Sequence, residues 1–219
     1  MRSYDEYCAI AKSLDVVGDR WTLLIVRELV LRGACRYTDL RNGLPGIATN
    51  LLADRLRELE QAGVIAREDA PPPIATTLFH LTQRGEHLRP VLDALFRWGA
   101  PLMTEQDPGD AVRSHWLAGA LEVMLTDREP DGVPLTVVLQ TADEPIVIEA
   151  HDGTIHTRLG PADRADVTLT GPPKPILGLL LGLLELADAK ASGITYQGDP
   201  AVLERIRPHT NPVAPPSQS

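Results

Sequence analysis

The sequence has few cysteines, no long hydrophobic run and no recognisable catalytic motif. Two cysteines cannot form a disulfide scaffold, so we expect reduced thiols and a cytoplasmic protein. The most apolar stretch, residues 176–184, is too short to span a bilayer, and the N-terminus lacks the apolar core of a signal peptide. These absences argue against a membrane protein and against secretion.

Signals for a bound metal or a cofactor are also missing. The six histidines and two cysteines are scattered without the spacing of metal ligands. No Walker-type loop, Gly-x-Ser-x-Gly element or Rossmann glycine fingerprint occurs. We therefore expect no metal site, no cofactor and no enzymatic activity.

Charge is distributed unevenly along the chain. Residues 1–100 contain equal numbers of basic and acidic side chains, so the whole net charge of −9 comes from residues 101–219. Residues 20–57 contain seven arginines and only three acidic residues. An acidic protein can still bind nucleic acid when its basic groups gather on one face, and this segment is the candidate for such a face.

The length of 219 residues predicts two domains. Charge, proline and glycine interrupt the apolar pattern at residues 104–110, which we interpret as a linker. The prediction is an N-terminal domain over residues 1–103, a C-terminal domain over residues 111–208 and a disordered tail rich in proline and serine over residues 209–219.

The N-terminal domain has the pattern of a winged helix-turn-helix. Apolar-periodic segments at 21–31, 37–41 and 49–62 predict three helices, with a turn at Pro45-Gly46 before the last. Strands at 64–68 and 76–81 would form the wing around a loop at 69–75. Thr82 is expected to cap a helix that reaches about residue 98 and bends near Pro90. In this motif the last of the three helices enters the major groove of DNA.

Several short motifs match one family of regulators. The chain resembles the HxlR-type transcriptional regulators, which are MarR-like, in Cys8, Gly18-Asp19-Arg20-Trp21, Leu44-Pro45-Gly46-Ile47 and the run from Arg55 to Glu60. The usual proline after the family's cysteine is Ala9 here, and the usual basic wing tip is replaced by three prolines and Asp69. The resemblance implies a DNA-binding regulator, and some members use the cysteine at the position of Cys8 to sense oxidants or electrophiles.

The helix at 49–62 is the predicted DNA reader. Its leucines at 52, 56 and 59 share one face, while Asn50, Asp54, Arg57 and Gln61 lie opposite, beside Ala53. Thr49 is expected at the N-cap, Asn50 can pair with adenine, and Arg57 can reach guanine or a phosphate. The predicted DNA contacts are Arg20, Arg36, Thr49, Asn50, Ala53, Arg57 and Arg67. The alternative is a plain surface helix with a leucine stripe.

A homodimer is expected because two reading helices give the affinity that a palindromic operator requires. The apolar residues available for an interface are Tyr4, Tyr7, Ile10, Leu14, Leu88, Val91, Leu92, Leu95 and Trp98.

The C-terminal domain is predicted to combine helices with β-strands. Helices are expected at 111–125, 177–186 and 201–206, the last capped by Asp199. Strands are expected at 135–140, 145–150, 154–159, 165–170 and 194–197. The stretch Asp166–Gly171, the glycine-leucine helix and Gly198-Asp199-Pro200 resemble the sterol carrier protein type 2 superfamily. The predicted fold class is therefore α+β: a winged helix-turn-helix followed by a sterol-carrier-like α/β domain with a mainly antiparallel sheet.

This second resemblance implies an apolar tunnel between the sheet and its helices. The predicted pocket residues are Trp116, Leu177, Leu180, Leu181 and Leu184. The alternative for all of them is an ordinary place in the hydrophobic core.

Three functions remain open from the sequence. The first is a regulator that binds double-stranded operator DNA and responds to an apolar small molecule. The second is a thiol-based sensor that uses Cys8, for which the alternative is a small buried apolar side chain. The third is a lipid carrier or enzyme whose winged helix only dimerises.

Overall fold

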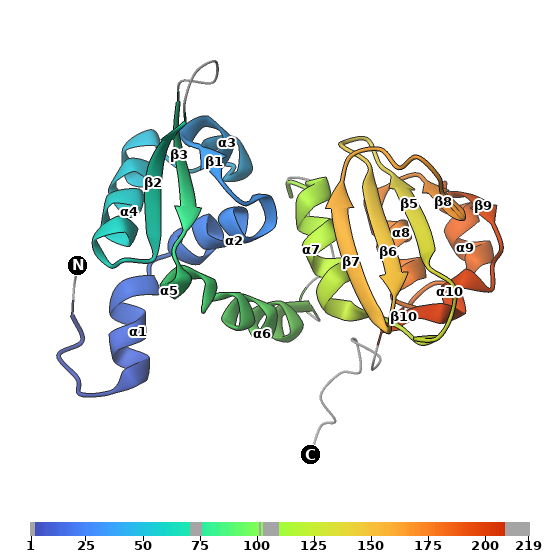
Figure 1. The fold of residues 1–219 in the computed structure, drawn as a ribbon, viewed down its shortest axis with the longest axis horizontal. Coiled ribbons are helices and arrows are strands. Elements are labelled where there is room, and N and C mark those ends of the chain that lie inside the picture. The colour runs from blue at the N-terminus through green and yellow to red at the C-terminus, as the bar shows by residue number, and fades with distance from the viewer. Residues whose placement is uncertain (1–2, 71–75, 101, 103–109, 209–219) are drawn as a thin grey trace. The chain divides into compact units, whose positions relative to one another are not determined.

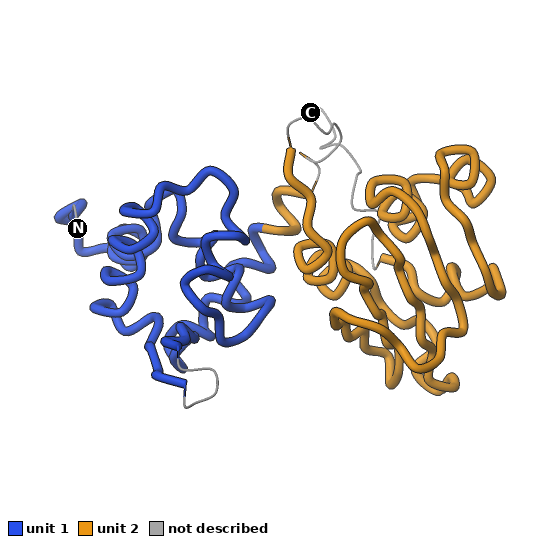
Figure 2. The backbone as a smooth tube through the Cα atoms, turned by 90° about the horizontal axis from the view of Figure 1, so that it is seen from above, with its two compact units in different colours: residues 1–95 blue, residues 96–219 orange. Residues whose placement is uncertain are grey.

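The computed structural model describes residues 3–70, 76–100, 102 and 110–208. The chain divides into two compact units, residues 1–95 and residues 96–219 (Figure 2). The tip of the predicted wing (71–75), nearly all of the predicted linker (104–109) and the predicted tail (209–219) lie outside the described residues. Among the residues that are described, no helix is both long and apolar enough to cross a membrane.

The N-terminal unit has the helix and strand order of a winged helix-turn-helix (Figure 1). Its elements are α1 (Ala9–Val17), α2 (Thr22–Arg32), β1 (Cys35–Arg36), α3 (Tyr37–Gly43), α4 (Thr49–Gln61), β2 (Ile65–Ala70), β3 (Thr76–Leu81) and α5 (Gln83–Glu86). The strands form an antiparallel sheet in the order β1-β3-β2. The short strand β1 was not predicted, whereas the β2–β3 hairpin and the three preceding helices agree with the sequence prediction.

A tight turn separates α3 from α4 and sets the direction of α4. The backbone N–H of Ile47 donates to the carbonyl of Leu44 at 3.1 Å, and Gly46 has a φ of +86°. This positive φ at the third position of a four-residue turn favours glycine. Leu44 and Ile47 are buried in the same core as Leu52, so the turn holds the start of α4 against α2 and α3.

The predicted long helix after the wing is two helices. The Thr82 hydroxyl accepts a hydrogen bond from the Gly85 N–H at 3.1 Å, which confirms the predicted cap. However, α5 ends at Glu86, and α6 runs separately over Arg89–Gly99 across the boundary between the units. Pro90 has no N–H to donate to the Glu86 carbonyl, so the ladder of helical hydrogen bonds breaks there.

The C-terminal unit contains a five-stranded mixed sheet with helices against it (Figure 1), and a separate two-stranded antiparallel sheet formed by its first and last strands. Its elements are α7 (Ser114–Met124), β4 (Leu125–Asp127), β5 (Leu135–Gln140), β6 (Ile146–His151), β7 (Thr154–Leu159), β8 (Val167–Thr170), α8 (Pro173–Leu180), α9 (Leu186–Ala191), β9 (Thr195–Gly198), α10 (Val202–Arg205) and β10 (Ile206–Pro208). The sheet order is β7-β6-β5-β8-β9, with β5 and β8 parallel and the other neighbours antiparallel.

The core of this unit lies between the sheet and α7, α8, α9 and α10. Alternate residues of β5, β6 and β8 are buried against leucines and alanines of these helices. The architecture is α+β, as the sequence predicts, and three of the four strand pairs in the five-stranded sheet are antiparallel.

Two local predictions in this unit are wrong. The glycine-leucine helix ends at Leu180, because Gly182 has a φ of +71° and the N–H groups of Leu183 and Leu184 both donate to the Gly178 carbonyl. The N-cap of α10 is Ala201, whose N–H donates to the Asp199 carboxylate at 2.9 Å, so Asp199 orders the approach to the helix without capping it.

Candidate nucleic-acid interface

The start of α4 is held by a side chain from α3. The Tyr37 hydroxyl donates to the Thr49 carbonyl at 2.8 Å. Thr49 is the first helical residue and Ala48 is the N-cap, so the prediction that the Thr49 hydroxyl caps the helix is wrong by one position. The capping preference for threonine could not show which residue first adopts helical dihedral angles. The exposed Thr49 side chain still lies at the end of α4 where backbone N–H groups are available to an anion.

The buried and the exposed residues of α4 lie on opposite faces, as the periodicity predicts. Leu52, Leu56 and Leu59 are at most 3% exposed and pack into the core. Asn50 and Arg57 are exposed on the other side, with Ala53 half-buried beside them. The helix therefore presents a polar surface with one small residue, which permits close approach to the floor of a major groove.

Salt bridges tie several of the basic residues near α4 to acids. Arg57 pairs with Asp54 at 2.5 Å on the exposed face, and Arg67 pairs with Glu60 at 3.0 Å at the base of the wing. Arg55 bridges to Asp19, in the turn between α1 and α2, and to Glu58. Arg55 thus anchors α4, whereas Arg57 and Arg67 remain more than half exposed.

Arg20 and Arg36 lie at the surface and form no ion pair with any described residue. The guanidinium carbon of Arg20 lies 5.7 Å from the centre of the Trp21 ring. The backbone N–H of Arg36 donates to the Asp39 carboxylate at 3.0 Å, which fixes the start of α3. Both cations are available to a phosphate from solvent.

A buried acid of α2 lies against the end of α3. Glu28 is fully buried in α2 and pairs with Arg27 at 2.8 Å and Arg32 at 3.4 Å. Gly43, at the end of α3, is in close contact with it: a Cβ added there would lie 2.0 Å from Glu28 Oε2. The sequence analysis missed this contact, because a single glutamate within an apolar helix gives no sign of its partners.

The two cysteines occupy opposite environments. Cys8 is exposed at the N-cap of α1, where the backbone N–H groups of Ala11 and then Ile10 lower the pKa of its thiol. Cys35 is buried in β1, and burial raises the pKa of its thiol to about 11. Within the single chain Cys8 is therefore not the buried apolar residue of the alternative interpretation, and Cys35 is the cysteine of that kind.

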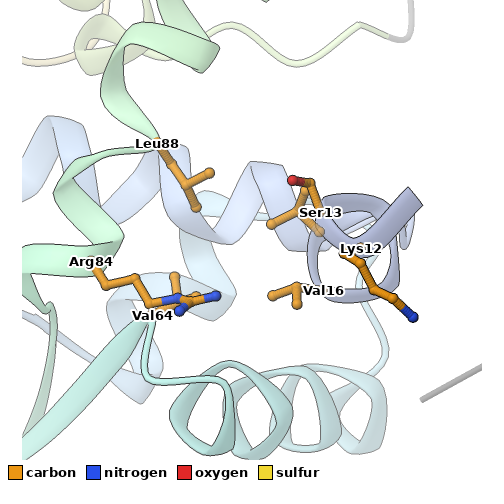
Figure 3. Close-up of a pocket in the computed structure, with 7 residues that line it drawn as sticks. Lys12, Ser13, Val16, Val64, Arg84 and Leu88 are labelled. Carbon is orange, nitrogen blue, oxygen red and sulfur yellow. The ribbon is translucent and has the colours of Figure 1, made fainter. Parts of the chain in front are cut away.

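A cavity of about 180 Å³ lies between α1 and the base of the wing (Figure 3). In Figure 3, Arg84 extends toward Val16, whereas the ammonium of Lys12 lies on the side away from Arg84. The lining residues are Lys12, Ser13, Val16, Val17, Val64, Arg84 and Leu88. None of the predicted DNA contacts lines it, so this cavity is separate from the polar face of α4.

None of the predicted pocket residues of the C-terminal unit lines the cavity at the beginning of α7 and α8. Leu180 is 1% exposed in the core, and Leu177 and Leu181 pack against that core. Leu184 lies against Gly178, and Trp116 is half-buried on α7. The cavity has a volume of about 380 Å³ and is lined by Val112, Ser114, Leu117, Thr141, Ala142, Asp143, Pro172, Pro173 and Lys174.

An ion pair inside the C-terminal unit was also missed. Arg205 donates to both carboxylate oxygens of Asp127, at 2.7 and 2.9 Å, and to the Val133 carbonyl at 2.7 Å. Both side chains are buried. The pair joins α10 to β4 across 78 positions of the sequence and is structural. Among the described residues, no group of three potential metal ligands occurs.

Comparisons with known proteins match the N-terminal part of the chain to helix-turn-helix regulators. The profile of the HxlR-like helix-turn-helix family matches residues 16–107. The chain is 34% identical over 87 residues to the HTH-type transcriptional regulator YvaP of Bacillus subtilis, covering 40% of this chain and 80% of YvaP. It is 33% identical over 104 residues to an HTH-type transcriptional regulator of Methanothermobacter thermautotrophicus, covering 47% of this chain and 79% of that protein. Among solved structures, the reduced form of YodB from B. subtilis matches with 28% identity and a TM-score of 0.40, over 47% of this chain and all of that one.

Proposed function

The chain belongs to the HxlR-like helix-turn-helix family of transcriptional regulators, and we propose that it reads a palindromic operator as a homodimer through α4. The observation that supports this most is the division of α4 into a buried leucine face and an exposed face with Asn50 and Arg57. Asn50 suits adenine, Arg57 suits guanine, and Arg20, Arg36 and Arg67 suit phosphates.

The experiment that tests this function is selection from a random duplex library by the full chain. We expect enrichment of an inverted repeat with half-sites about one helical turn apart, because a two-fold dimer presents two reading helices. Enrichment of no sequence would overturn the proposal and favour the third alternative, a carrier or enzyme whose winged helix serves only to dimerise.

Substitutions on α4 should separate base reading from phosphate binding. Arg57→Ala and Asn50→Ala should each weaken binding to the selected operator by about 1–3 kcal/mol, because each removes a bidentate base contact. Arg20→Ala and Arg36→Ala should weaken binding to operator and scrambled DNA alike and flatten its salt dependence. Fluorescence anisotropy on both duplexes at several salt concentrations measures this. If Arg57→Ala and Asn50→Ala both left operator affinity unchanged, the assigned reading face would be wrong.

The dimer is proposed to form through apolar residues of α1 and α6. Ile10 is 71% exposed, Trp98 is 74% exposed, and α6 contains no buried residue. Tyr4, Tyr7, Leu14, Val91 and Leu95 add to this exposed apolar surface, whereas Leu88 and Leu92 pack against the core of the N-terminal unit. A second copy of the chain would cover an apolar surface that a monomer leaves in water.

Light scattering at micromolar concentration should therefore give twice the chain mass of 23.8 kDa. Ile10→Glu should give a monomer that binds operator weakly, because the charge would be buried in the interface. Val133→Glu makes the same change at a site that is 80% exposed in the C-terminal unit and should remain dimeric. A wild-type monomer would contradict the proposed interface.

Residues 111–208 are proposed to be a sterol-carrier-like domain that binds an apolar effector. The support is the stack of helices on one face of the mixed sheet and the 380 Å³ cavity beside α8. For such a ligand to regulate the protein, its affinity for the DNA-bound and the free dimer must differ.

A second candidate function, thiol-based sensing, is favoured by the position of Cys8. An exposed thiol at a helix N-terminus with a lowered pKa reacts faster with electrophiles than a buried one. Iodoacetamide near pH 7 should modify Cys8 well before Cys35 in the folded protein, as measured by peptide mass spectrometry. If the modified protein kept its full operator affinity, Cys8 would have no regulatory role.

A further inference from the structure

Asp54 lies in the middle of the exposed face of α4, where a carboxylate repels the phosphates of DNA. Asn50, Asp54 and Arg57 are spaced by four and three residues, so they form one line on the helix, opposite the leucines. The Asp54 side chain is 49% exposed and the Arg57 side chain is 66% exposed. Because DNA is a polyanion, a negative charge here weakens binding. We therefore ask which function of Asp54 offsets that loss.

The contact that Asp54 makes is a hydrogen bond from one end of the Arg57 guanidinium. Arg57 Nη2 donates to Asp54 Oδ1 at 2.5 Å. A guanidinium has five N–H donors in one plane, so this bond leaves donors for the O6 and N7 atoms of a guanine. It also restrains the group and offsets part of its charge, which reduces its attraction to an isolated phosphate.

Two other arginines of the N-terminal unit differ from Arg57 in having no ion pair with a described residue. Arg20 and Arg36 are exposed without an ion pair to any described residue, as suits groups that hold phosphates of any sequence. Arg57 lies on the reading face and is paired. Arg67, the third arginine proposed to hold a phosphate, is paired with Glu60 at 3.0 Å, so the contrast with Arg57 applies to Arg20 and Arg36 only.

We propose that Asp54 is a specificity-determining residue, whose bridge to Arg57 directs the guanidinium to a guanine edge and withholds it from backbone phosphates. This inference rests on the proposed reading of DNA by α4. At a DNA site without guanine opposite Arg57, the Asp54 carboxylate still repels the phosphates, but Arg57 makes no base contact that offsets the repulsion. Such sites therefore bind weakly.

Asp54→Asn tests the inference because it keeps the shape of the side chain and removes its charge. Binding to scrambled duplex should tighten roughly 3- to 10-fold, and its log-affinity against log-salt plot should steepen by about one unit, as one more phosphate contact requires. The preference for operator over scrambled DNA should fall by ~10-fold, within the range of one lost base discrimination. In the Arg57→Ala background, Asp54→Asn should no longer change that preference.

Glu86→Gln is the matched control. Glu86 pairs with Arg89 three residues on, at 3.1 Å, and both side chains are 49% exposed, but the pair lies outside α4. This variant removes one negative charge from the same unit and should leave the preference for operator unchanged. A uniform effect of net charge would appear equally in Glu86→Gln and in Asp54→Asn.

The outcomes separate this inference from the function on which it rests. If the wild type prefers operator and Asp54→Asn keeps that preference and salt dependence, Asp54 is only a solvated charge and the inference is wrong. If the wild type shows no preference for any duplex, the proposed function fails and the inference fails with it.

Discussion

Replacing Arg205 with alanine is expected to lower the free energy of unfolding of the C-terminal unit by about 3–5 kcal/mol. The guanidinium donates twice to the buried Asp127 and once to the Val133 carbonyl. Without it, the Asp127 carboxylate would remain in the interior with no cation beside it. Urea unfolding followed by circular dichroism measures the loss. Glu204→Ala, which breaks the exposed pair with Arg207, is the control and should change stability far less.

The Arg205–Asp127 pair also predicts that the stability of the C-terminal unit depends on pH. The hydrogen bond from Arg205 is the main cause that lowers the pKa of Asp127. A lowered pKa in the folded state means that the stabilisation is present above the unfolded value of about 3.9 and is lost as the pH falls through the folded value. Loss of stability below about pH 4 should therefore be steeper in the wild type than in Arg205→Ala. Equal slopes in the two proteins would show that Arg205 does not lower the pKa of Asp127 in the folded state.

Gly43→Ala is the second change with a large expected effect, and it acts at the end of α3, next to the turn that leads into α4. The new Cβ would lie 2.0 Å from Glu28 Oε2, so the buried carboxylate must move away from Arg27 and Arg32. Overpacking of this kind costs about 1–3 kcal/mol, and more if the carboxylate loses both cations. We expect a lower unfolding free energy for the N-terminal unit and weaker operator binding.

A double substitution shows whether the clash with the Glu28 carboxylate causes the loss of stability in Gly43→Ala. Glu28→Ala makes room for the alanine at position 43, so Gly43→Ala should cost less in that background than in the wild type. The Arg27 and Arg32 side chains are 27% and 35% exposed, so both keep access to solvent when the carboxylate is removed. Additive costs in the double-substitution cycle would mean that the two residues do not act through this contact.

The sequence predicts best where the signal is local. The strands 76–81, 135–140 and 154–159 have the predicted bounds, because alternation and flanking turn residues define them without distant partners. The leucine stripe of α4, Leu52, Leu56 and Leu59, is likewise periodic over two turns, and it orients the helix correctly.

The sequence predictions fail where distant contacts or a single residue determine the secondary structure. Strands β4 and β10 have three residues each and pair across the unit, so no local pattern marks them. The glycine-leucine helix ends early because Gly182 adopts a positive φ, which the apolar pattern does not show. Asp54 was recognised on the reading face, but its bond to Arg57 became evident only from the geometry.

Methylation interference on the selected operator tests the central claim most directly. Dimethyl sulfate methylates guanine at N7 in the major groove and adenine at N3 in the minor groove, so one experiment distinguishes the grooves. If α4 reads the major groove, guanine N7 methylation should block binding in both half-sites, and Arg57→Ala should lose that sensitivity at one guanine in each. Interference at adenine N3 alone would contradict the account.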